Sequence, residues 1–111
     1  MINIEKRDKI NIVTFKTDTI NALITDEIRD QIIKIFEASN SKVIIDLSGV
    51  RHIDSMGFAS FLSIRKTARN NFGTLKFVNP SPSVMEVLRI LHLNTVFDIY
   101  EDLDECIQAM R

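Results

Sequence analysis

The chain has 111 residues, of which 45% are hydrophobic and 26% are charged, a composition typical of one folded domain with its own core. Its 14 basic and 15 acidic residues leave a net charge of −1, which argues against direct binding to nucleic acid. The chain shows no secretory signal pattern, no apolar run of membrane-spanning length and only one cysteine, so we expect a cytoplasmic protein without disulfides or membrane insertion.

The N-terminal third predicts a hairpin followed by a helix. Residues 2–5 and 10–15 alternate apolar and polar side chains around a short turn, which is typical of an antiparallel pair with one solvated face. Apolar residues then recur at helical spacing over residues 23–36. Asn21 or Thr25 is the expected N-cap of this helix.

The middle of the chain predicts a buried strand, a second helix and another strand. Residues 43–47 form an almost continuous apolar run, which is expected of a central strand covered on both faces. Apolar positions over residues 58–72 predict the second helix, with Gly73 as its left-handed end. Residues 74–78 then read as a strand.

The C-terminal third predicts a helix, a short strand over residues 96–100 and a last helix capped by Asp102. Pro82 fits the first position of the third helix, and a capping box of Ser83 with Glu86 is the alternative. The complete order is ββαβαβαβα, which predicts an α/β fold with a mixed, mostly parallel sheet, an N-terminal antiparallel hairpin and about four helices. The inner face of the last helix is expected to contain Leu103, Cys106, Ile107 and Met110.

A polar tetrapeptide, Asp54-Ser55-Met56-Gly57, lies where the second helix is expected to begin. Ser55 has two interpretations there. Serine is a favoured helix N-cap, and local rules favour this reading because such caps are common. A phosphorylation site is the alternative, since the free amides and the dipole of a helix start accommodate a phosphate without unfolding the domain.

The same region does not predict an enzyme. His52, Asp54 and Ser55 fall within four residues, so the histidine has little scope to bridge the other two as in a catalytic triad. One histidine and one aspartate are too few ligands for a metal, and Cys106 lies on an apolar helical face. The three glycines are too widely separated for a phosphate-binding loop. We therefore expect no catalytic residue, no metal site and no cofactor.

Asp46 is an acidic residue at the end of the apolar central strand. A carboxylate in such a position hydrogen-bonds loop amides or holds a nearby cation or donor. We predict that Asp46 supports the loop over residues 48–54.

From Val43 to Met110 the chain resembles the STAS domain of bacterial anti-sigma factor antagonists. The resemblance rests on the strand ending in Asp46, the spacing to the tetrapeptide at residues 54–57, the helix that follows and the downstream Asn79-Pro80 segment. The hairpin and first helix also match in order and length. We therefore expect residues 1–111 to form one STAS domain.

The resemblance implies a regulator that works by exchanging partners. The unphosphorylated protein would bind an anti-sigma factor that is also a serine kinase, which frees a sigma factor for transcription. This kinase would phosphorylate Ser55 and end the binding, and a PP2C-type phosphatase would remove the phosphate. The partner-binding residues implied are Asp18, Asn21, Asp54, Met56, Gly57 and Phe58.

The chain departs from the family pattern on this expected partner face. Met56 stands where many members have serine or threonine, Phe58-Ala59 replaces the usual Leu-Gly, and Asn21 replaces an aspartate. The alternative function is a STAS module that does not switch and instead scaffolds a transporter ATPase or a signalling complex. In that case Ser55 would serve only as a helix cap.

Overall fold

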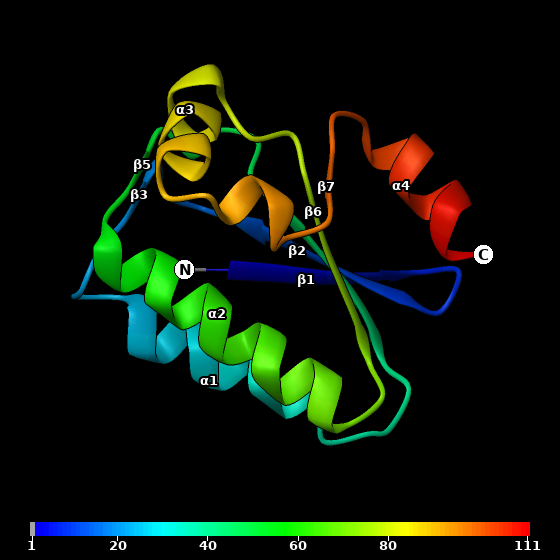
Figure 1. Cartoon of the computed structure of the whole chain (residues 1–111). Coiled ribbons are helices and arrows are strands. Elements are labelled where there is room, and N and C mark those ends of the chain that lie inside the picture. The colour runs from blue at the N-terminus through cyan, green and yellow to red at the C-terminus, as the bar shows by residue number, and fades with distance from the viewer. Residues whose placement is uncertain (1) are drawn as a thin grey trace.

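A mixed β-sheet of five strands forms the centre of the computed structural model, which describes residues 2–111 (Figure 1). In their order across the sheet, the strands are β1 (Ile2–Arg7), β2 (Ile10–Phe15), β4 (Lys42–Asp46), β6 (Thr74–Val78) and β7 (Ile99–Tyr100). β1 and β2 pair antiparallel, and every other neighbouring pair is parallel. The predicted hairpin and the mostly parallel sheet are thereby confirmed.

Four α-helices cover the two faces of this sheet, as predicted. They are α1 (Thr25–Ile35), α2 (Ser55–Asn70), α3 (Pro82–Ile90) and α4 (Leu103–Met110). α1 and α2 lie side by side on one face, and α4 lies on the opposite face (Figure 1). None of the helices within residues 2–111 is both long enough and apolar enough to span a membrane.

The central strand β4 separates two apolar cores because successive side chains point to opposite faces of a sheet. Val43 and Ile45 belong to the larger core, which α1, α2 and α3 cover. Ile44 belongs to the smaller core beneath α4. This burial on both faces explains the continuous apolar run that identified the strand in the sequence.

Two short strands, β3 (Thr19–Ile20) and β5 (His52–Ile53), form a second, parallel sheet that the sequence did not predict. The backbone N–H of Arg51 extends this connection by donating to the carbonyl of Asp18 at 2.7 Å. At the other end, the N–H of Asp54 donates to the carbonyl of Ile20 at 3.1 Å. The small sheet therefore connects the segment before α1 to the start of α2.

The end of α2 differs from the prediction at Gly73. Phe72, not Gly73, adopts the left-handed conformation, with φ of 57°. Gly73 is needed for close packing instead, because a Cβ atom there would lie 2.6 Å from the ring of Phe36, well inside contact distance. The glycine was correctly placed at the helix end, but its role there is steric.

The start of α1 also differs from the prediction. Its N-cap is Ile24, which has no side-chain capping bond, and Thr25 is a buried residue of the first turn. The Asn21 side chain instead accepts from the N–H of Leu23 at 3.0 Å, in the turn that precedes the helix.

The ends of the last two α-helices agree better with the sequence. Pro82 is the first residue of α3, as predicted, but the cap is Ser81, whose Oγ accepts from the N–H of Val84 at 3.2 Å. Asp102 caps α4 as predicted. A 3₁₀ helix, η1 (Leu93–Thr95), follows α3 and delays the last strand, which begins at Ile99 rather than at residue 96.

Cys106 is a fully buried residue of α4, and burial raises the pKa of its thiol to about 11. We expect iodoacetamide at pH 8 to alkylate the folded protein at least 100-fold more slowly than the urea-unfolded protein, because thiolate is the reacting form. Mass spectrometry over time measures both rates. Equal rates would show that α4 opens readily in solution.

Candidate functional site

Ser55 is the first residue of α2, and its side chain is exposed. The N-cap is the preceding residue, Asp54, whose Oδ1 accepts from the N–H of Gly57 at 2.9 Å. The interpretation of Ser55 as the helix cap is therefore wrong. Within residues 2–111 the Ser55 hydroxyl has no hydrogen-bond partner, so it is free to face a second molecule.

The start of α2 is electrostatically suited to an added anion. Its first turn contains no acidic residue, and the first amides of a helix have no acceptor within the helix. The carboxylate of Asp54 satisfies the N–H of Gly57, and the carbonyl of Asp54 accepts from the N–H of Phe58 at 3.2 Å. The N–H groups of Ser55 and Met56, together with the helix dipole, remain to stabilise a negative charge.

Gly57 fixes this first turn against the small sheet. A Cβ atom on Gly57 would lie 2.6 Å from Cγ2 of Ile53 and 3.2 Å from Cγ2 of Ile20. Only a glycine lets the helix approach β5 and β3 this closely without displacing those side chains. The serine is thus carried on a turn that two strands hold in place.

The structure places the residues of the predicted partner face in different environments. Asp18, Asp54 and Met56 are exposed, and Asn21 is half-buried. Gly57 is buried, which leaves it only an indirect role in shaping the face. Phe58 is only 4% exposed and belongs to the larger core, so its side chain is not available to a partner.

Leu23 is an exposed residue that the sequence placed on the buried side of the first helix. It precedes α1 and is 91% exposed, so helical periodicity does not govern where its side chain points. The segment between β3 and α1 lies at the same end of the molecule as the start of α2 (Figure 1), and Met56 in the first turn of α2 is 52% exposed. Both side chains add exposed apolar surface to this part of the domain.

Asp46 organises the loop that leads from β4 toward β5. Its Oδ1 accepts from the backbone N–H of Ser48 at 2.9 Å and from the Ser48 hydroxyl at 2.6 Å. The same oxygen accepts from Nδ2 of Asn79 at 3.3 Å, at the end of β6. The carboxylate thus connects two strand ends and the loop between β4 and β5.

The chain matches a known domain family over nearly its whole length. The family model described as "STAS domain" matches residues 1–106. A Thermotoga maritima protein, provisionally named an anti-sigma factor antagonist, is 28% identical over 71 residues. This alignment spans 64% of the chain and 63% of the relative's length, which is less than two thirds of either protein.

Solved structures show the same fold. An anti-sigma-factor antagonist (STAS) domain protein from Planctomyces limnophilus superposes with a TM-score of 0.90 at 21% identity, covering 98% of this chain and 97% of that one. The anti-sigma factor antagonist SpoIIAA in its unphosphorylated form gives a TM-score of 0.83 at 19% identity, covering 100% and 96%.

A mixed, mostly parallel sheet with four α-helices on its two faces defines a small α/β domain. The chain belongs to the STAS domain family.

Proposed function

We propose that the protein is an anti-sigma factor antagonist that regulates transcription by partner switching in the cytoplasm. In its unphosphorylated form it binds an anti-sigma factor serine kinase, and the bound kinase releases a sigma factor. Phosphorylation of Ser55 ends this binding, and a PP2C-type phosphatase restores it. The names of the Thermotoga relative and of the structural neighbours support this role.

The observation that carries the proposal is the environment of Ser55. The hydroxyl is exposed and is not used to cap α2, because Asp54 fills that position. A modification there costs the fold no hydrogen bond, and the free amides of the helix start offset the added charge. The effect of a phosphate should therefore fall on the partner and leave the domain folded.

The proposed partner surface, here called the switch face, consists of Asp18, Asn21, Leu23, Asp54, Ser55 and Met56. Leu23 and Met56 would supply the apolar contact, and the polar members would form a rim around it, as in many transient protein interfaces. Ser55 is one of these residues, and its hydroxyl has no hydrogen-bond partner among residues 2–111. A kinase bound to this face would therefore find its own phosphate acceptor there.

Incubation with the serine kinase captured from the source organism, together with ATP, should add one phosphate to the protein. Mass spectrometry of peptides should locate it on Ser55, and Ser55→Ala should remain unmodified. Ser63, which is exposed on the same helix, supplies the control: Ser63→Ala should be phosphorylated like the wild type. A phosphate at another residue, or no phosphate, would contradict the proposed switch.

A further inference from the structure

A cavity of about 410 Å³ lies between α2 and β6, well removed from the switch face. Ten residues of helix separate Ser55 from Arg65, which corresponds to about 15 Å along the axis of α2. We call this cavity the α2–β6 pocket. Its lining includes Arg65, Arg69, Thr74, Leu75, Thr95 and Asp98.

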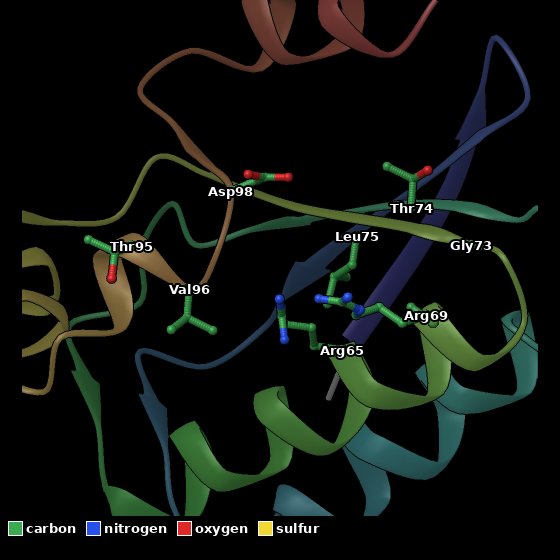
Figure 2. Close-up of a pocket in the computed structure, with 9 residues that line it drawn as sticks. Arg65, Arg69, Gly73, Thr74, Leu75, Thr95, Val96 and Asp98 are labelled. Atoms are coloured by element: carbon green, nitrogen blue, oxygen red, sulfur yellow. The ribbon is translucent and has the colours of Figure 1, made fainter.

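Two arginines of α2 converge in this pocket. Arg65 and Arg69 are four residues apart, so their side chains leave the same face of the helix. Figure 2 shows both side chains extending in the same direction from α2 into the space beneath β6. Within residues 2–111, neither forms an ion pair or a side-chain hydrogen bond. Two like charges held together without a carboxylate between them create a site of positive potential.

The one carboxylate in the lining does not neutralise these arginines. Asp98 places its Oδ2 3.2 Å from Nζ of Lys76. Lys76 follows Leu75 in the strand, so its side chain leaves the opposite face of the sheet. In Figure 2, Asp98 lies on the far side of β6 from the two guanidinium groups.

The strand edge adds an uncharged donor to the same pocket. The N–H of Thr74 donates to the carbonyl of Ser41, which lies next to β4. The N–H and C=O of Leu75 therefore point the other way, because hydrogen-bonding directions alternate along a strand. β7 pairs with β6 only from Phe77 onward, so this edge of Leu75 is open. The N–H of Leu75 is therefore an uncharged donor at the edge of β6 that borders the pocket.

We propose that the α2–β6 pocket binds phosphate, either free or as the phosphate group of a small molecule. Guanidinium groups match phosphate oxygens in pairs of parallel hydrogen bonds, and two of them balance a dianion. A carboxylate has only two oxygens and would form such a pair of hydrogen bonds with only one of the two guanidinium groups. The volume is within the range of pockets that hold small molecules, which leaves room for an organic group beside the phosphate.

Titration of the ¹⁵N-labelled full chain with sodium phosphate tests this inference, with sodium chloride added to keep ionic strength constant. Wild-type protein should show saturable shifts at the side-chain N–H groups of Arg65 and Arg69 and at the amide of Leu75. Arg65→Gln combined with Arg69→Gln should weaken binding at least tenfold. Lys66→Gln is the matched control, because Lys66 is exposed on the same helix outside the lining, and it should bind like wild type.

Three results would overturn the inference: shifts that do not saturate, equal affinity in the double arginine variant, or saturable shifts confined to residues 55–58 at the helix start. Thermal unfolding of each variant checks that the fold is retained.

Glycerol 3-phosphate, titrated in the same way, separates the two sources of phosphate. Tighter binding than inorganic phosphate identifies an organic phosphate as the ligand, and equal or weaker binding identifies free phosphate.

Discussion

Phosphorylation of Ser55 is expected to weaken binding to the anti-sigma factor kinase at least 100-fold, and Ser55→Asp to weaken it at least tenfold. The phosphate brings a charge of about −1.5 to −2 into the switch face. An interface formed around a neutral hydroxyl has no counter-charge for it, and an uncompensated charge at an interface costs several kcal/mol. Each 1.4 kcal/mol corresponds to a factor of ten in affinity. Aspartate carries a smaller charge and gives the smaller loss.

The Ser55→Asp substitution should not destabilise the folded domain. An acidic side chain in the first turn of a helix is stabilising by about 0.3–1 kcal/mol, and this turn has no acidic residue of its own. The melting temperature of Ser55→Asp should therefore equal or exceed that of the wild type. A loss of affinity with no loss of stability separates the proposed switch from simple unfolding.

Isothermal titration of the purified kinase against each variant measures the effect. Ser55→Ala should bind like the wild type, because the hydroxyl makes no bond that the fold needs. Ser63→Asp places the same charge at an exposed position of α2 that lies outside the switch face, and its affinity should not change. Wild-type affinity for Ser55→Asp would instead favour the alternative of a STAS module that does not switch.

The longer helices and strands could be predicted from the sequence because each buries enough side chains to give a recognisable repeat of apolar residues. The apolar run of β4 and the helical spacing of α1 and α2 are examples. β3 and β5 have two residues each, which is too short for any alternation to be recognised. These strands form only because residues about 33 positions apart pair with each other. A local sequence pattern does not reveal such pairing.

The candidate site was predictable in its position but not in its details. The tetrapeptide at residues 54–57 identified the start of α2, yet Asp54 and Ser55 are both good caps by local rules. The position at which the backbone leaves β5 decides which of the two residues caps α2, and the sequence does not specify that position. Phe58 belongs to the core because the first turn of α2 packs on the small sheet, and that sheet was not predicted. The exposure of Leu23 follows from the late start of α1.

The α2–β6 pocket could not be found in the sequence at all. Arg65 and Arg69 look like ordinary solvent-facing residues of an amphipathic helix. Their significance depends on the short length of β7, which leaves the edge of β6 open at Leu75. It also depends on η1, which brings Thr95 to the pocket from far along the chain.

Phe77→Ala is expected to lower the free energy of unfolding by about 3–5 kcal/mol, a large part of the 5–15 kcal/mol typical of a domain. Phe77 is 2% exposed and lies between two other rings. Its centroid is 5.3 Å from that of Phe61 on α2 and 4.7 Å from that of Phe97, before β7. Removing it leaves a cavity and breaks both aromatic contacts, each worth about 0.5–1.5 kcal/mol beyond burial.

Phe72→Ala supplies the matched control, because it removes the same atoms from a side chain that is 80% exposed. Urea unfolding followed by circular dichroism should show a change within about 0.5 kcal/mol, as is usual for surface positions. Equal losses in the two variants would contradict the assignment of Phe77 to the core. The size of the stability loss in Phe77→Ala also shows how firmly β7 is held, because that strand pairs with β6 through only two residues. If β7 moves inward to fill the cavity, the loss falls toward the lower limit, because the cost of a cavity depends on how far its walls collapse.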